Sequence, residues 1–257
     1  MLPAERHRRI SAVVDRVGTI STEDLADQLG VSAETVRRDL GQMERRGVLR
    51  RVRGGAASLA VVQGVGGEEA SFADRATSQT EAKAAIGRAA ADLVRPGMTV
   101  AIDVGTTAVE IARALAPDFR GTVVTPSLQV AGIVAALPQA VVLLPGGRVR
   151  GGDLVCSGPG TVRFFADVFA DLAFIGSGGI DASAGVTDFH YEEIATKQQI
   201  LTNSARAYVV ADGNKWGRVV GHRVCAVGDV TGVITDASAD TDLTAVVKDT
   251  GCEVVVA

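Results

Sequence analysis

Arginine is concentrated in one short segment near the start of the chain. Seven arginines lie in the seventeen positions from Arg37 to Arg53, and lysine is absent from the first 82 residues. The forked donors of arginine match the O6 and N7 acceptors of guanine as well as phosphate oxygens. The plainer alternative is a surface whose arginines only keep the protein soluble, but such surfaces usually mix both signs of charge. The pattern therefore favours double-stranded DNA as a partner.

Three helices and a hairpin are expected to position these arginines. Apolar residues recur at helical spacing over residues 4–17, and a second helix begins at a Ser21 cap and ends at Gly30. Ser32 caps a third helix, and the segments "VLRRV" and "RGGA" after it are typical of a short hairpin. The apolar stripe of the third helix consists of Val36, Leu40 and Met43. Residues 1–57 therefore predict a winged helix-turn-helix domain.

The third helix has the character of a recognition helix. A helix in the major groove contacts bases with its N-terminal residues, whereas cations at its end and on a hairpin are better placed for phosphates. With the apolar stripe facing inward, Glu34 and Arg38 point outward. The expected DNA-binding residues are Ser32, Glu34, Thr35, Arg37 and Arg38 in the first turns, and Arg45, Arg50, Arg51 and Arg53 after them.

Charge divides the chain into two parts, and composition argues against a metalloprotein, a secreted protein and a membrane protein. Residues 1–57 carry a net charge of +3 and the remainder −7, which suggests two modules with different partners. The three cysteines lack metal-ligand spacing, so we expect reduced thiols in a cytoplasmic protein without a metal or cofactor. The start of the chain lacks the apolar region of a signal peptide. The uncharged run 121–147 is broken by three prolines, so no membrane span is expected.

The remainder of the chain predicts a linker and an α/β domain. Residues 58–77 are small, glycine-rich and aperiodic, as in a linker. Ser78 and Glu81 are spaced as a capping box that opens a helix. Short apolar strands then alternate with helices, which predicts a mostly parallel sheet over residues 78–257 with helices on both faces.

A phosphate site is expected in the segment "DVGTT". Asp103 ends a strand, Gly105 allows a tight turn, and Thr106 and Thr107 start a helix. Free backbone N–H groups, the helix dipole and two hydroxyls would favour a phosphate there. A threonine that merely caps the helix would explain the same residues.

Other polar residues are expected at the same edge of the sheet, because ligands of open α/β sheets bind at the carboxyl ends of strands. Gly178, Gly179 and Asp181 follow one strand, Asp212 and Lys215 follow another, and Lys197 lies on a helix. Lys197 could instead be an ordinary surface lysine, and Asp212 with Lys215 could form only a salt bridge within a turn.

The segment "VSAETVRRDLGQMERRGVLRRVRGGA" resembles the N-terminal signature of the DeoR family of bacterial transcriptional regulators. The family's Arg-Arg-Asp-Leu motif matches residues 37–40, whereas Arg53 stands where histidine is usual. Later segments resemble the family's effector domain, which is similar in fold to ribose-5-phosphate isomerase. The resemblance implies a homo-oligomeric regulator, a dimer or tetramer, that represses a sugar or polyol operon. A phosphorylated sugar or polyol would release it from operator DNA.

The resemblance implies an effector site made of Asp103, Gly105, Thr106, Thr107, Gly178, Gly179, Asp181, Lys197, Asp212 and Lys215. Pro126 departs from the family, where asparagine is commoner, and removes a side chain that could have touched a ligand. The alternative function is a sugar-phosphate isomerase fused to a DNA-binding head. Isomerisation needs a general base and a second acid-base group, and the resembled isomerase has paired acidic residues where this chain offers Asp181 alone. We therefore expect a sensor without catalytic residues.

Overall fold

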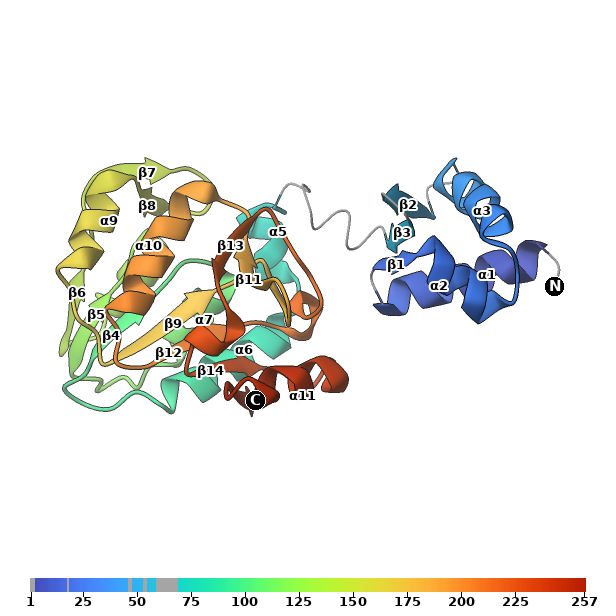
Figure 1. The fold of residues 1–257 in the computed structure, drawn as a ribbon. Coiled ribbons are helices and arrows are strands. Elements are labelled where there is room, and N and C mark those ends of the chain that lie inside the picture. Colours follow the sequence, from blue (N-terminus) through green and yellow to red (C-terminus); the bar gives the residue numbers. More distant parts are fainter. Residues whose placement is uncertain (1–2, 18, 46–47, 53–54, 59–68) are drawn as a thin grey trace. The chain divides into compact units, whose positions relative to one another are not determined.

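The computed structural model describes residues 3–17, 19–45, 48–52, 55–58 and 69–257. The chain forms two compact units, Met1–Glu68 and Glu69–Ala257 (Figure 1). The expected linker, 58–77, extends too far, because the helix α5 (Phe72–Thr77) already belongs to the second unit. Small residues and glycines before this helix concealed it from a reading based on apolar periodicity.

The first unit contains the three expected helices and a small antiparallel sheet. The helices are α1 (Pro3–Val17), α2 (Thr22–Leu29) and α3 (Ala33–Arg45). The hairpin strands β2 (Leu49–Val52) and β3 (Gly55–Ser58) are joined by a third, β1 (Thr19–Ser21), in the order β1-β3-β2. The predicted caps are confirmed: Ser21 accepts from the N–H of Asp24 at 3.0 Å, and Ser32 accepts from the N–H of Thr35 at 3.2 Å. Gly30 ends α2 with a φ of 64°.

A seven-stranded sheet forms the second unit, which we call the sensor unit. All its neighbouring strands are parallel, in the order β15-β14-β12-β9-β4-β5-β6, so the prediction of a mostly parallel sheet is confirmed. The strands are β4 (Thr99–Ile102), β5 (Gly121–Val124), β6 (Ala140–Leu143), β9 (Leu172–Gly176), β12 (Ala207–Val210), β14 (Gly232–Thr235) and β15 (Glu253–Val256).

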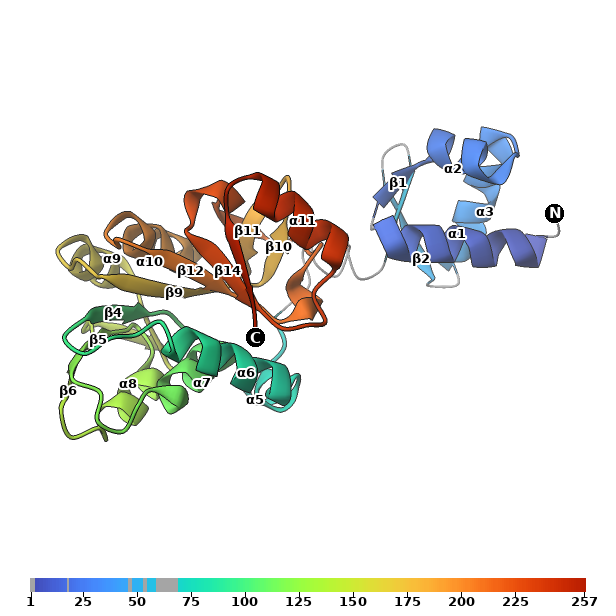
Figure 2. The ribbon, with the colours of Figure 1, turned by 90° about the horizontal axis from the view of Figure 1, so that it is seen from below.

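Helices cover both faces of this sheet (Figure 2). Alternate residues of one strand enter different cores, as strand geometry requires: Val100 and Ile102 pack with α6, α7 and α8, whereas Ala101 packs with α9, α10 and α11. The first group of helices is α6 (Thr80–Ala91), α7 (Thr106–Ala114) and α8 (Leu128–Val134). The second is α9 (Pro159–Ala166), α10 (Tyr191–Thr202) and α11 (Thr241–Asp249).

Two smaller β structures lie outside the main sheet. The strands β10 (Gly179–Asp181), β11 (Gly185–Asp188) and β13 (His222–Cys225) form an antiparallel sheet, and β7 (Arg148–Arg150) pairs with β8 (Val155–Ser157). Single turns of 3₁₀-helix, η1 (Gly213–Lys215) and η2 (Val227–Asp229), follow β12 and β13. In the part of the chain described, no helix is both long and apolar enough to cross a membrane.

The predicted capping box at Ser78 is wrong. Ser78 ends α5, and α6 begins after Gln79, whose φ of 54° is left-handed and whose side chain caps nothing. The turn is instead held by Lys83, whose ammonium donates to the carbonyls of Arg75 and Ser78. A buried lysine thus holds the turn, while no side chain caps the start of α6.

Candidate functional site

The outer face of α3 carries the side chains expected to contact DNA. Val36, Leu40 and Met43 are buried, whereas Glu34, Arg37 and Arg38 are exposed, as the helical projection predicted. Arg37 contacts Glu34 at 3.4 Å and Glu23 at 3.6 Å, and exposed pairs of this kind contribute little to stability. Arg38 has no hydrogen bond or ion pair with any described residue. Its guanidinium is therefore available to a nucleic acid.

Asp39, in the middle of the Arg-Arg-Asp-Leu motif, holds the recognition helix to α1. It is 3% exposed, and both its oxygens receive hydrogen bonds from Arg6, while Nε2 of His7 lies 3.1 Å from Oδ1. Burial opposes ionisation, but Arg6 and His7 outweigh it and lower the pKa of Asp39 below its ordinary value. Sequence reasoning missed this cluster, although Asp39 lies three residues after Val36 on the inward face of the helix.

The later arginines are only partly described. Arg45 ends α3, and Arg50 and Arg51 lie on β2. Their side chains, and the whole of Arg53, lie outside the described residues. Contacts from these four arginines to phosphates remain a prediction.

The segment "DVGTT" forms an uncapped helix start. Gly105 is the N-cap of α7 with a φ of 112°, and no side chain hydrogen-bonds to the first turn. Thr106 and Thr107 are the first two helical residues, so the alternative in which a threonine caps the helix is wrong. Neither hydroxyl hydrogen-bonds to another residue in the described part of the chain. Both remain free to donate to a ligand at the positive end of the helix dipole.

Two cations, Arg75 and Lys83, lie at this helix start. The charge of Lys215 acts on Lys83, and the charges of Arg75 and Arg218 act on Lys215, so we call the four the cationic cluster: Arg75, Lys83, Lys215 and Arg218. Nη1 of Arg75 is 3.9 Å from the position that a Cβ atom would take on Gly105. Burial lowers the pKa of Lys83, of Lys215 and of Arg218, and the carboxylates of Asp212 and Glu69 only partly offset it. Cations that carry an uncompensated burial penalty are stabilised by a bound anion.

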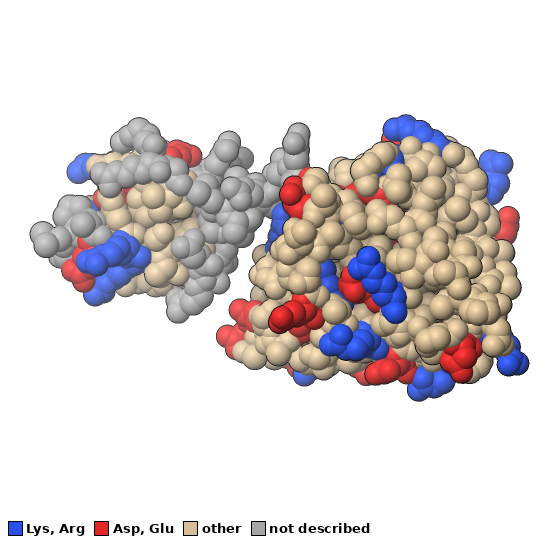
Figure 3. Space-filling view, turned by 180° about the vertical axis from the view of Figure 1, so that it is seen from behind, with Lys and Arg blue, Asp and Glu red and all other residues tan. Residues whose placement is uncertain are grey.

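The surface of the sensor unit carries charges of both signs. On the face of the sensor unit drawn in Figure 3, acidic and basic side chains are interspersed over a largely uncharged surface. A pocket of about 60 Å³ lies beside Thr106 and Lys83, between α5, α6, α7 and α8.

Lys197 and Asp103 form a closed network beneath the strand ends. Lys197 is 1% exposed, pairs with Asp103 and with Asp188 at 3.0 Å, and donates to the carbonyl of Gly176 at 3.1 Å. Asp103 also accepts from the N–H of Gly176 at 2.9 Å. Burial opposes the charge of Lys197, but the carboxylates around it outweigh that penalty and raise its pKa. The alternative of a surface lysine is wrong, and both side chains are satisfied within the protein.

The remaining predicted residues shape the loops of the site. A Cβ on Gly179 would lie 2.2 Å from the carbonyl of Arg218, and one on Gly178 would lie 2.7 Å from Val220, so both glycines permit close packing of the segment that carries Arg218. Asp181 accepts three hydrogen bonds from Ser183 and Ala184 within the β10–β11 turn.

Asp212 and Lys215 do not pair with each other. Asp212 accepts from the N–H of Asn214 at 3.1 Å and so caps η1, the turn that carries Lys215. No ion pair joins the two side chains in the described structure, so the alternative of a turn salt bridge is wrong. The side chain of Lys215 has no hydrogen bond or ion pair with a described residue, and the charges of Asp212, Arg218, Glu69 and Arg75 act on it.

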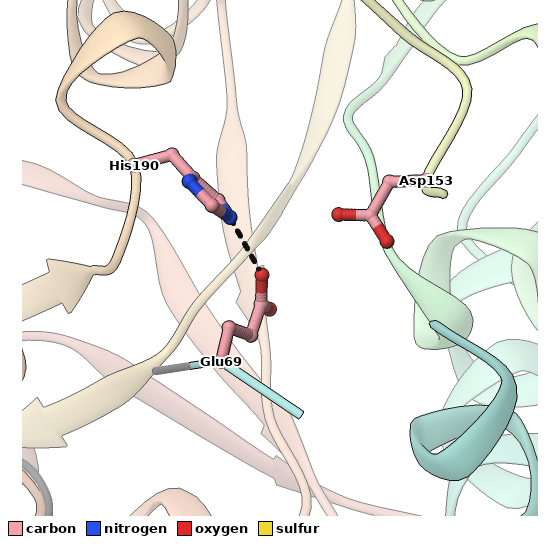
Figure 4. A group of neighbouring side chains, drawn as sticks. All are labelled: Glu69, Asp153 and His190. Carbon is pink, nitrogen blue, oxygen red and sulfur yellow. Dashed lines mark hydrogen bonds and ion pairs between the residues drawn. The ribbon is translucent and has the colours of Figure 1, made fainter. Parts of the chain in front are cut away.

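Glu69, Asp153 and His190 form a second group at this edge (Figure 4). Oε2 of Glu69 is 3.0 Å from Nε2 of His190, and Asp153 lies opposite. Arg75 bridges the two carboxylates, at 3.2 Å from Glu69 and 2.8 Å from Asp153, and Arg150 contacts the other oxygen of Asp153 at 2.7 Å.

The spacing of these three groups would also suit a divalent cation, but two guanidinium groups already neutralise the carboxylates. The arrangement is therefore built to hold arginine. Sequence reasoning missed the group because it assigned Glu69 and Arg75 to the linker and gave His190 no role.

Comparisons with known proteins match both units. A family model described as a DeoR-like helix-turn-helix domain matches residues 6–61, and one described as a DeoR C terminal sensor domain matches residues 78–237. The chain belongs to the DeoR family. It is 33% identical over 239 residues to the glycerol-3-phosphate regulon repressor of Escherichia coli (strain K12), covering 92% of each chain. It is 34% identical to the HTH-type transcriptional regulator GlpR of Haloferax volcanii over 99% of this chain and 98% of that one.

Solved structures resemble this DeoR-family chain only loosely. Ribose 5 phosphate isomerase A from Neisseria gonorrhoeae matches 55% of this chain with 15% identity and a TM-score of 0.41. The sorbitol operon regulator SorC from Klebsiella pneumoniae matches 76% with 12% identity and a TM-score of 0.37. Family membership therefore rests on the family models and the sequence relatives, and it makes the protein a DNA-binding transcriptional repressor rather than an enzyme.

Proposed function

We propose that this repressor releases its operator when a phosphorylated sugar or polyol binds at the start of α7. The observation that carries the proposal is the uncapped helix start at Gly105, Thr106 and Thr107 with two members of the cationic cluster beside it. Backbone N–H groups, two free hydroxyls and under-compensated cations are together the chemistry that holds a phosphate dianion.

Relatives support the choice of ligand class. The Escherichia coli relative is named for glycerol 3-phosphate, which makes that compound the first to test here. The carbon chain of such a ligand would extend toward the loops that carry Lys215 and Arg218. Asp181 is engaged in its turn and offers no free base there, in keeping with sensing.

On DNA, we propose that Arg38 reads bases and that the later arginines contact phosphates. Arg38 is exposed in the first turns of α3 and unpaired among the described residues, which suits contact with a base edge. A symmetric homo-oligomer, a dimer or tetramer, would place two such helices on the two halves of an operator.

The test replaces both threonines by valine, which keeps their shape and removes two donors. A hydrogen bond to a charged group contributes about 1.5–3 kcal/mol, so effector affinity should fall at least about a hundredfold. Affinity for operator without effector should stay unchanged, because α3 is untouched. The measurement is a titration of operator complexes, on DNA obtained by in vitro selection, with glycerol 3-phosphate and other sugar phosphates.

Thr241→Val is the matched control, because Thr241 is also the first residue of a helix but Asp240 caps that helix. It should respond to effector as the wild type does. An unaltered response of Thr106→Val/Thr107→Val to an effector that releases the wild type would place the phosphate elsewhere.

A further inference from the structure

Arg75 lies where the two units of the chain are joined in sequence. It belongs to the first segment of the sensor unit, which directly follows residues 59–68. All three guanidinium nitrogens bind within that edge of the unit: Nε donates to the carbonyl of Ala70 at 3.0 Å, Nη1 contacts Glu69 and Nη2 contacts Asp153. One side chain therefore fastens the first residues of the unit to its body.

The same guanidinium reaches the proposed phosphate site. Nη1, which contacts Glu69 at 3.2 Å, is also 3.9 Å from the position that a Cβ atom would take on Gly105 at the start of α7. A phosphate on the N–H groups of that helix start would lie within reach of Arg75 and close to the carboxylate of Glu69. The phosphate and Glu69 would repel each other and would need the same donor.

We propose that Glu69, Arg75 and His190 form a latch that the effector opens. The proposal rests on the proposed function, since it concerns regulation of the same site. Without effector, Arg75 and His190 hold Glu69 against the sensor unit. A bound phosphate takes Nη1 of Arg75, so Glu69 keeps only its contact with His190, and the segment before α5 is held less tightly.

A change in this segment would couple effector binding to the DNA-binding unit, the first unit of the chain. Residues 59–68 are the covalent connection between the units, and Glu69 is the first described residue after them. A ligand that binds the open latch more tightly than the closed one shifts the population toward the open form. By linkage, any change that weakens the closed latch must tighten effector binding.

This reciprocity supplies the test, which uses the full chain with Glu69→Gln. The substitution removes the competing charge and keeps the shape of the side chain. Affinity for inorganic phosphate and for glycerol 3-phosphate, measured by calorimetry, should rise about fivefold, the effect of a weak ion pair. Hydrogen exchange in the peptide 69–77 should speed up when phosphate is added to the wild type, and should already be fast in Glu69→Gln.

Glu81→Gln is the matched control. Glu81 is exposed on α6 and has no hydrogen bond or ion pair with a described residue, so its change should leave phosphate affinity as in the wild type. Unchanged or weaker phosphate binding by Glu69→Gln would overturn the latch. If the latch fails in this way but Thr106→Val/Thr107→Val loses phosphate binding, the proposed phosphate site is still supported and only the latch is refuted. A wild type that binds neither ligand overturns both.

Discussion

Replacing Lys197 by methionine should destabilise the sensor unit strongly. The change removes the cation between Asp103 and Asp188 and leaves two carboxylates at a site where the lysine side chain is 1% exposed. Removal of one partner from a buried ion pair costs about 3–5 kcal/mol. For a unit of this size, such a loss lowers the melting temperature by roughly 10 °C. Urea and thermal unfolding, followed by the fluorescence of Trp216, measure the effect, since Trp216 is the only tryptophan in the chain.

The same variant has a characteristic pH dependence. Burial raises the pKa of Asp103 in the folded protein, and Lys197 opposes that effect, so the pKa should rise further without the lysine. Stability from a raised pKa is present at low pH and is lost as the pH rises through that value. The free energy of unfolding that the variant loses relative to the wild type should therefore be smaller at pH 5 than at pH 8.

A matched substitution separates this network from a general loss of lysine. Lys248 is exposed in the last turn of α11, so Lys248→Met should change the free energy of unfolding by less than about 0.5 kcal/mol. A loss below about 1 kcal/mol for Lys197→Met, or a deficit equal at the two pH values, would refute the assignment of Lys197 to a buried network.

Two further predictions concern the DNA-binding unit. Arg38→Ala should cost about 1–3 kcal/mol of binding free energy on the selected operator and relax specificity at one base pair in each half-site. Arg50→Ala should weaken binding to all sequences alike and reduce the slope of log affinity against log salt by about one. An equal loss of affinity for operator and random DNA in Arg38→Ala would contradict base reading. Asp39→Asn should lower the melting temperature of this unit at pH 7. Because the pKa of Asp39 is lowered on folding, its contribution is present above the unfolded pKa and lost as the pH falls through the folded one, so the variant and the wild type should converge in acid.

Local signals predicted much of the fold. The caps at Ser21 and Ser32 and the end at Gly30 involve residues within a few positions of one another, so their geometry can be read from spacing. The strands of the main sheet are apolar on both faces because helices cover both, and such runs stand out in a sequence. The segment "RVCAVG" has the same composition but forms β13 in the small sheet, since composition does not specify a strand's partner.

The candidate site was predicted less well than the fold, because charged residues were assigned to a ligand although some of them bind partners within the protein. Lys197 and Asp103 are 94 positions apart, and only the folded chain shows that they satisfy each other. Arg75 and Asp153 are separated by 78 positions, and Arg75 lay in a segment without apolar periodicity. Long-range pairing of this kind has no signature in spacing, so the cationic cluster emerged only from the structure.

The order of strands in the main sheet has a consequence for synthesis of the chain. The last described strand of the DNA-binding unit ends at Ser58, and the sheet of this unit joins strands close in sequence. The strand β4, in contrast, lies between β5 and β9, so one of its edges stays unpaired until Gly176 has left the ribosome. Domains generally fold as units and N-terminal first, whereas long-range parallel pairing is slow. A nascent chain thus holds a folded DNA-binding head well before it holds a sensor. A product truncated before β9 would keep that head while exposing the unpaired backbone edge of β4 to proteases and chaperones.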